Sequence, residues 1–403
     1  MTEQAKVPAI RFAGFTDPWE QRKLGEFGSV AMCKRIYKEQ TSEQGDVPFF
    51  KIGTFGADPD AFISNELFED YKRTYPYPTP GTLLISAAGS IGRIVEYQGE
   101  KAYFQDSNIV WLEHEHRLND AFLKPLYSKI EWGLEGSTIK RLYNKDLLSA
   151  EVTIPDGREQ KEIGQFFAKL DDLITLHQRK YDKLVVFKKS MLEKMFPKDG
   201  ESVPEIRFAG FTDPWEQREL GEFSKKNTIK NANGALSETF TNSAEQGVIS
   251  QLDYFDHDIT NDANISGYYV VQPDDFVYNP RISATAPCGP INRNRLNRAG
   301  VMSPLYTVFS VDASMDKTYL EHYFKTSRWH DFMFLEGNTG ARSDRFSISD
   351  ATFFEMPIWC PEISEQMAIA KQLETTDSLI TLHQRKLELL QNIKKSLLDK
   401  MFV

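Results

Sequence analysis

The chain has 403 residues, 40% hydrophobic and 26% charged, the composition of a globular protein long enough for two or three domains. Its 48 basic and 58 acidic residues give a net charge of −10, which argues against a protein that binds nucleic acid unaided. It lacks a run of eighteen apolar residues, a signal-peptide pattern and closely spaced cysteines, so we expect a cytoplasmic protein without membrane spans, disulfides or structural zinc.

The first predicted element is a lead-in, IRFAGFTDPWEQR, which spans residues 10–22 and recurs letter for letter at 206–218. Thirteen identical residues indicate an internal repeat. The stretch contains no cluster of metal ligands, no glycine-rich loop and no nucleophile beside a base. We therefore expect it to be structural and to pack each copy of the repeat against a shared frame.

The first middle segment, roughly Lys23 to Thr153, alternates short β-branched and aromatic runs with Gly and Asn. GTLLISAAGSIGRIVEYQG and FQDSNIVWLEHE are typical of strands and turns, whereas AFLKPLYSKIEWGL is typical of a helix. These elements predict an α+β domain.

A long helix is predicted next, over Glu159 to Phe196, because apolar residues recur at an a/d-like spacing with charges between them. Pro197 ends it. At 1.5 Å per residue the helix would be about 55 Å long.

The second copy follows the same order. Its middle segment, roughly Glu219 to Pro357, again indicates strands, turns and helices but aligns poorly with the first. Its helix, Glu365 to Phe402, repeats LITLHQRK and closely matches the ending KSMLEKMF. Each apolar stripe is narrow, so we expect the two helices to pair as an antiparallel coiled coil. The alternative is that each packs on its own domain.

The predicted fold class is therefore α+β, with two mixed α/β domains separated by two long helices and an internal pseudo-two-fold repeat. The expected boundaries are 1–153 for the first domain with its lead-in, 154–200 for the first helix, 201–357 for the second domain with its lead-in and 358–403 for the second helix.

The two middle segments share one loop. GSTIKRLYNKD and GARSDRFS align so that Gly136 matches Gly340 and Arg141 matches Arg345, which gives a common Gly-x-x-x-x-Arg pattern. Arg and Lys in loops bind phosphates, and Arg and Asn can bind base edges. For any single residue of these loops, a solvated surface charge is the alternative interpretation.

Three patterns are similar to catalytic motifs, and none is convincing. DPW at 17–19 and NPR at 279–281 lack the second proline of the Asp/Asn-Pro-Pro-aromatic motif of amino-group DNA methyltransferases. PDGREQK at 155–161 contains the acids and lysine of some nucleases, but at a helix start, where acidic residues suit the positive helix end. The seven histidines show no metal-binding spacing. We expect no catalytic or metal site.

Together these stretches resemble the specificity subunit of Type I restriction–modification enzymes. The similarity rests on the GFTDPWEQRKLGEF-type opening, PGTLLISAAGSIG, GSTIKRLYNKDLLSAEVTIP, the EQKEIGQFFAKLDDLITLHQRK helix and their second-copy counterparts. The resemblance implies that each middle segment is a target recognition domain for one half of a bipartite, asymmetric DNA site. It also implies that the helices set the spacer between the half-sites.

The resemblance further implies partners. Two methylation subunits would dock on the helices and carry S-adenosylmethionine, and restriction subunits would carry ATP and magnesium. This chain would be non-catalytic and hold no cofactor. The methylation subunits would supply part of the phosphate contact with double-stranded DNA, which eases the conflict with the acidic net charge. The candidate DNA-binding residues are Ser90, Arg93, Lys140, Arg141 and Tyr143 in the first copy and Asn279, Arg281, Arg293, Arg295, Arg342 and Arg345 in the second.

Two other classes of function remain open from the sequence. The chain could be a scaffold whose two domains bind proteins, which the acidic charge favours. It could also be a nuclease or methyltransferase that acts alone.

Overall fold

The computed structural model describes residues 7–114, 117–132, 141–198, 200–255, 262–339 and 344–403. The chain forms two compact units, Met1–Gln178 with Arg385–Val403 (unit 1) and Arg179–Gln384 (unit 2). The long helices α4 (Gly157–Lys194) and α10 (Ile363–Met401) each contribute to both units.

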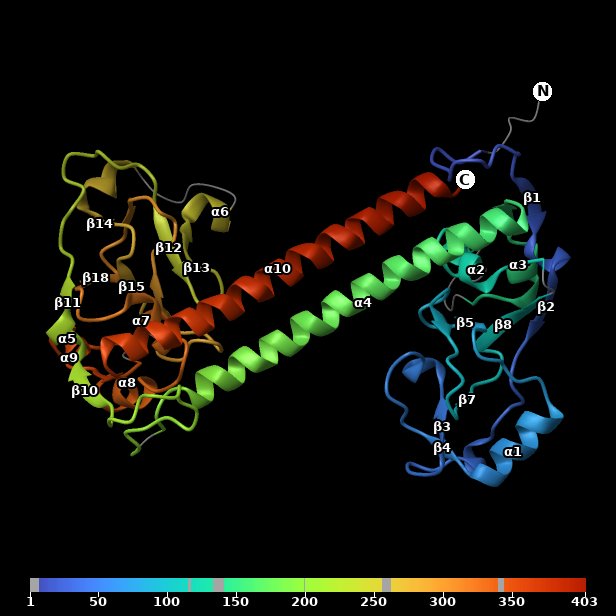
Figure 1. Cartoon of the computed structure of the whole chain (residues 1–403), viewed down its shortest axis with the longest axis horizontal. Helices are drawn as coiled ribbons and strands as arrows, with labels where there is room; N and C mark the ends of the chain where they lie inside the picture. The colour runs from blue at the N-terminus through green and yellow to red at the C-terminus, as the bar shows by residue number, and fades with distance from the viewer. Residues whose placement is uncertain (1–6, 115–116, 133–140, 199, 256–261, 340–343) are drawn as a thin grey trace. The chain divides into compact units, whose positions relative to one another are not determined.

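A four-stranded antiparallel sheet is the centre of unit 1 (Figure 1). Its strand order is β2 (Gly28–Ala31), β8 (Ile109–His114), β5 (Leu83–Ser86) and β6 (Ile94–Glu96). Successive side chains of a strand point to opposite faces. Leu83 and Ile85 therefore enter one core cluster, and Leu84 enters another. The sheet of unit 1 is buried on both faces, which explains the apolar run Leu83–Ile85 in β5.

The two faces of this sheet are covered differently. A layer of strands and one helix packs on the Leu84 face; we call it the second layer of unit 1. It consists of β3 (Val47–Phe50), β4 (Phe62–Ile63), β7 (Tyr103–Phe104) and α1 (Asn65–Thr74). The start of α4 packs on the other face, together with α2 (Asp120–Tyr127), α3 (Asn144–Ser149), β1 (Glu20–Lys23) and β9 (Glu151–Ile154).

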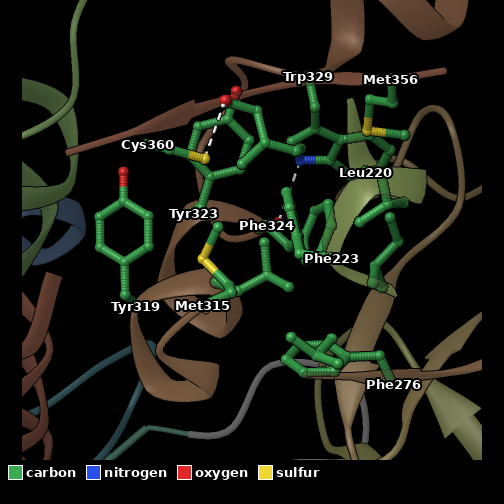
Figure 2. Close-up of a cluster of buried hydrophobic side chains, with 14 of the residues drawn as sticks. Leu220, Phe223, Phe276, Met315, Tyr319, Tyr323, Phe324, Trp329, Met356 and Cys360 are labelled. Atoms are coloured by element: carbon green, nitrogen blue, oxygen red, sulfur yellow. Dashed lines mark hydrogen bonds between the residues drawn. The ribbon is translucent and has the colours of Figure 1, made fainter. Parts of the chain in front are cut away.

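Unit 2 contains a sheet with the same order of equivalent strands. These are β11 (Ser224–Lys226), β18 (Thr307–Val311), β15 (Phe276–Tyr278) and β16 (Ile291–Arg293). Phe276 lies in the larger core cluster, whose aromatic and sulfur-containing side chains Figure 2 shows, whereas Val277 faces a smaller cluster. The middle segments, which align poorly in sequence, thus have the same sheet topology.

The remaining elements of unit 2 fall into two groups. The second layer of unit 2 covers the Val277 face and consists of β12 (Phe240–Ser243), β13 (Gly247–Ser250), β14 (Tyr269–Val271), β17 (Gly300–Met302) and α6 (Gln251–Phe255). The frame of unit 2 consists of β10 (Glu216–Glu219), α5 (Leu220–Phe223), α7 (Lys317–Tyr323), α8 (His330–Glu336), α9 (Asp350–Phe354), β19 (Pro357–Cys360) and the start of α10.

The repeated lead-in is a clamp on the start of each long helix. In unit 1, Arg11 donates two hydrogen bonds to the Glu159 carboxylate, at 2.8 and 2.6 Å, and Trp19 Nε1 donates a third at 3.1 Å. In unit 2, Arg207 donates to Glu365 at 2.7 and 2.8 Å. Glu159 and Glu365 are buried. Both glutamates lie in the first turn of their helix, and Asp156 Oδ1 accepts from the backbone N–H groups of Arg158 and Glu159, so the acidic helix start expected from the sequence is confirmed, and the glutamates also hold the lead-ins.

The next residue of each long helix reaches a neighbouring helix. Gln160 Oε1 accepts a hydrogen bond from the backbone N–H of Asn119, the N-cap residue of α2, at 3.1 Å. Gln366 Oε1 accepts from the N–H of Asp316, the N-cap residue of α7, at 2.9 Å. Each Glu-Gln pair therefore attaches two segments to the first turn of the long helix. The glutamate binds the lead-in, and the glutamine binds the start of α2 or α7.

The two long helices pack against each other within each unit, and they run antiparallel there. In unit 1 Lys394 forms an ion pair with Asp171 at 2.5 Å, and Phe402 packs on Phe167. In unit 2 Lys188 pairs with Asp377 at 2.5 Å. The predicted antiparallel pairing is found in both units, where the helix ends also enter the domain cores. No helix in the described part of the chain is long and apolar enough to cross a membrane.

Candidate nucleic-acid interface

Each unit brings the same two loops together. In unit 1 the loop after β5 meets the arginine loop, because the backbone N–H of Leu142 donates to the carbonyl of Ala87 at 2.9 Å. In unit 2 the loop after β15 meets the equivalent loop, because Phe346 N–H donates to the Pro280 carbonyl at 2.7 Å. The shared arginines therefore lie beside equivalent strand ends, Arg141 beside the end of β5 and Arg345 beside the end of β15. The structure brings together loops that are far apart in sequence.

In unit 1 the two candidate arginines, Arg93 and Arg141, each donate a hydrogen bond to a backbone carbonyl. Arg93 Nη2 donates to the carbonyl of Gly56 at 3.0 Å, and Arg141 Nη2 donates to that of Ser107 at 3.0 Å. A guanidinium group has five N–H donors. Each arginine is therefore oriented by one bond and retains donors for a ligand.

The other candidates of unit 1 lie near these arginines. Ser90 is exposed in the turn that contains Gly89 and Gly92, both at positive φ. Its carbonyl accepts from the Ser86 hydroxyl, which fixes the turn. Tyr143 precedes α3 and is 47% exposed. Lys140 lies outside the described residues.

In unit 2 Arg281 and Arg345 lie opposite each other in an antiparallel bridge. Like charges at directly opposite positions repel. Arg281 Nη2 lies 3.7 Å from Oδ2 of Asp344, and 66% of the Arg281 side chain is exposed. An anionic or acceptor-rich ligand would relieve this repulsion.

Both arginines border a pocket of about 540 Å³. Hydroxyl, amide and phenol groups dominate the rest of its lining, from Thr239, Thr241, Ser243, Gln251, Tyr254, Ser283, Thr285 and Tyr306. Thr241 Oγ1 and Tyr306 Oη are hydrogen-bonded at 3.2 Å. These residues were not predicted, because they come from separate segments without a motif and only the folded second layer gathers them.

Asn279 lies at this pocket too, but its amide supports the loop. The side-chain Oδ1 accepts from the backbone N–H of Arg281 at 3.0 Å, and Nδ2 donates to the carbonyl of Asn242 at 2.8 Å. Both ends of the amide are thus engaged, and the group shapes the position of Arg281.

Arg293 and Arg295 are not gathered with the arginines of the pocket. Arg293 is buried between Asp274 and Thr318, with 11% of its side chain exposed. Arg295 donates to Glu321 at 2.8 Å and to Glu374 at 2.9 Å. Burial acts against the charge of Arg295, but these hydrogen bonds outweigh that effect and raise its pKa. Both arginines support the fold around α7 and α10. Arg342 lies outside the described residues.

Neither a metal cluster nor a reactive thiol is found in the part of the chain that the structure describes. No group of three or more His, Cys, Asp or Glu residues there is placed to hold a metal ion. Burial raises the pKa of Cys33 and Cys360 to about 12 and that of Cys288 to about 11. A thiolate, not a thiol, is the nucleophile, so these cysteines are inert at neutral pH.

Comparison with known proteins finds a family match for the first part of the chain. Residues 16–185 match the family model of the Type I restriction modification DNA specificity domain. The match covers less than half of the chain, and over these residues it confirms the resemblance to the specificity subunits. Unit 2 repeats the topology of unit 1 outside the matched range.

Two curated relatives carry corresponding names. A putative type I restriction enzyme specificity subunit of Haemophilus influenzae is 51% identical over 153 residues, which cover 38% of this chain and 40% of that protein. The putative type I restriction enzyme MjaX specificity subunit of Methanocaldococcus jannaschii is 23% identical over 95% of this chain and 92% of that protein. The chain thus matches less than half the length of the first relative and nearly all of the second.

A solved structure has the same fold along the whole chain. The crystal structure of the Type-I restriction-modification system S subunit from M. genitalium covers 99% of both chains, with 14% sequence identity and a TM-score of 0.57. The predicted fold class is confirmed at this level.

Proposed function

We propose that this chain is the DNA sequence-recognition subunit of a Type I restriction–modification complex, in which each unit binds one half of a bipartite, asymmetric site. One observation carries the proposal: both units place an arginine of a shared loop, Arg141 or Arg345, beside the end of the equivalent central strand. The family match of residues 16–185 supports it for unit 1.

The chemistry of the loops suits a DNA groove. A guanidinium group can donate two hydrogen bonds to guanine O6 and N7, or bind a phosphate. Arg93, Arg141, Arg281 and Arg345 are the described candidates that retain such donors. The net charge of −10 means that these local cations, and not the whole chain, would attract DNA.

We further propose that the long helices hold the partner subunits. Several large apolar side chains on these helices are exposed in each unit, among them Leu173 and Leu176 in unit 1 and Val186 and Leu382 in unit 2. Exposed apolar groups on a paired helix suit a protein–protein contact. Two methylation subunits would dock there with S-adenosylmethionine, and restriction subunits would bring ATP and magnesium. This chain would then catalyse nothing itself.

In this proposal the helix length sets the spacer between the half-sites. The helices have nearly equal lengths of 38 and 39 residues. Removal of one heptad from each would shorten the path by about 10 Å, or about three base pairs. The spacing of the half-sites that such a variant selects measures this. An unchanged spacing contradicts it.

The test of recognition is selection from random-sequence duplex DNA by the full chain, co-purified with its methylation subunits, at several salt concentrations. We expect a split motif. Arg141→Ala should weaken one half and Arg345→Ala the other, each by about tenfold to a hundredfold, because a bidentate base contact contributes about 1–3 kcal/mol.

Arg73→Ala is the matched control, since Arg73 lies on α1, 80% of its side chain is exposed and it forms an ion pair with neighbouring Asp70. It should leave both halves unchanged. A complex that retains DNA without sequence preference, or arginine variants that affect both halves equally, would contradict the proposal.

A further inference from the structure

The pocket of unit 2 contains two side chains whose hydrogen-bonding groups the fold leaves unused. Thr239 Oγ1 and Gln251 Oε1 are both buried, and neither has a hydrogen-bond partner among the described residues. Most buried polar atoms in native proteins have a partner, and an unpaired one is costly. Two such atoms in one pocket therefore indicate a ligand that supplies hydrogen bonds.

These two residues lie side by side. The β12–β13 hairpin pairs Phe240 with Ser250, and the Gln251 N–H donates to the Thr239 carbonyl at 2.8 Å. Thr239 and Gln251 are thus the next opposite pair, and opposite residues of a hairpin share a face. Thr241 shares this face as well, but Tyr306 satisfies its hydroxyl. The two residues with unpaired groups are therefore neighbours on the hairpin.

We propose that Gln251, with Thr239 beside it, is the residue through which unit 2 distinguishes adenine in its half-site; this rests on the proposed function. A carboxamide accepts from adenine N6–H and donates to N7, which is the common bidentate contact of glutamine in the major groove. Because Gln251 Oε1 has no hydrogen bond to lose, the carboxamide can turn toward a base at no such cost.

The unpaired oxygen also decides between classes of ligand. A phosphate or another free anion would suit Arg281 and Arg345 at the rim of the pocket. A phosphodiester of the DNA backbone has neither N–H nor O–H to donate, so it would leave Gln251 Oε1 unsatisfied. An exocyclic amino group of a base satisfies that oxygen while the rim arginines bind neighbouring acceptors.

The experiment uses the full chain with its methylation subunits and selection from random-sequence duplex DNA. The variants are Gln251→Ala and Gln251→Glu, and the control is Gln272→Ala, an exposed glutamine of the same unit outside the pocket lining. We expect Gln251→Ala to lose about tenfold to a hundredfold of the preference for adenine at one position of one half-site. Gln251→Glu should shift that preference toward cytosine, whose N4 amino group donates to a carboxylate.

A second measurement isolates the atoms. Duplexes with 7-deazaadenine at that position lack N7, so they should bind the wild-type complex more weakly and the Gln251→Ala complex equally well. If both half-sites stay the same in the Gln251 variants, the proposal is wrong while the function stands. If the wild-type complex shows no sequence preference, both fail. Thermal unfolding of each variant separates a loss of folding from a loss of discrimination, and Gln251→Glu keeps the shape of the side chain.

Discussion

Units 1 and 2 share a central sheet and differ in the second layer that covers one face of it. In unit 1 this layer is rich in tyrosine, and burial raises the pKa of Tyr77 and Tyr103 far above its usual range. In unit 2 the hydrophobic cluster under this layer is smaller, and a buried amide pair, Asn292 Nδ2 to Asn242 Oδ1 at 2.6 Å, supports it. The shared strands need only an apolar side chain on that face, so unlike layers can be accommodated. The layer that borders the arginine loop is therefore the variable part.

The two lead-ins show the opposite relation. Their sequences are identical, but the environments of equivalent residues differ. Trp19 and Trp215 occupy the same place in the two lead-ins, and both are buried. Trp19 Nε1 donates to Glu159, whereas Trp215 Nε1 has no partner among the described residues. The tryptophan of the lead-in thus donates a hydrogen bond to the clamp glutamate in unit 1 but not in unit 2, and this difference can be tested.

The largest expected effect is loss of the clamp. Glu159→Ala removes a carboxylate that is 1% exposed and leaves Arg11 and Trp19 buried without it. Breaking a buried ion pair costs about 3–5 kcal/mol. Glu365→Ala should cost about 1 kcal/mol less, because Trp215 loses no hydrogen bond there. Hydrogen exchange of β9 and of β19, the strands next to each lead-in, measures the two losses separately.

The control for this comparison is Glu362→Ala, an exposed glutamate just before α10. It should leave the exchange of both strands unchanged. Equal losses for Glu159→Ala and Glu365→Ala would show that the Trp19 hydrogen bond contributes nothing measurable.

The frame could be predicted from the sequence because it is written twice. The match of the lead-ins and of the LITLHQRK stretches fixed the repeat, and the a/d-like spacing predicted two long helices that pair. The helices begin at Gly157 and Ile363, close to the expected starts. The loop that contains Arg141 and Arg345 was found because those residues stand at fixed offsets from the frame.

The composition of the site could not be predicted as well. Arg293 and Arg295 belong to a charged stretch, NRNRLNR, but their carboxylate partners are 19 to 79 positions away. No sequence pattern marks Gln251 and Thr239. Their importance rests on side-chain oxygens that lack a hydrogen-bond partner in the folded chain. A pattern of residue types shows which groups are present, and only the fold shows which groups remain unused.

The next prediction compares how the stability of the equivalent helices α7 and α2 depends on pH. His322 is the sixth residue after the N-cap of α7, and Pro125 holds that place in α2. Burial lowers the pKa of His322 to about 4, helped by Lys188 and Arg295 and opposed by Asp377 and Glu374. The unfolded chain therefore takes up this proton first, at its ordinary pKa of about 6.5.

The stability of unit 2 should thus be constant above pH 6.5 and decrease as the pH falls from 6.5 to 4, by up to about 3 kcal/mol. Hydrogen exchange of α7, corrected for the intrinsic rate at each pH and referred to α2, measures it. His322→Gln should abolish the His-dependent part. A decrease of equal size in α2, or one that survives in His322→Gln, would locate the effect elsewhere.

The smallest expected effect concerns one position of the long helices, which is Gly164 in α4 and Ala370 in α10. A Cβ at Gly164 would lie 2.7 Å from backbone atoms of Ala121 and Phe122 in α2, and backbone cannot yield as a flexible side chain does. Overpacking of this kind costs about 1–3 kcal/mol, and the better helix propensity of alanine returns about 1 kcal/mol. Gly164→Ala should therefore destabilise unit 1 by about 1 kcal/mol, although the same residue is native at the equivalent place in unit 2.

Ala370→Gly should also destabilise, by about 1 kcal/mol, since it loses helix propensity and a buried methyl group. Denaturant unfolding of both variants measures this, and if Gly164→Ala were stabilising, the close approach of α4 to α2 would be absent in solution.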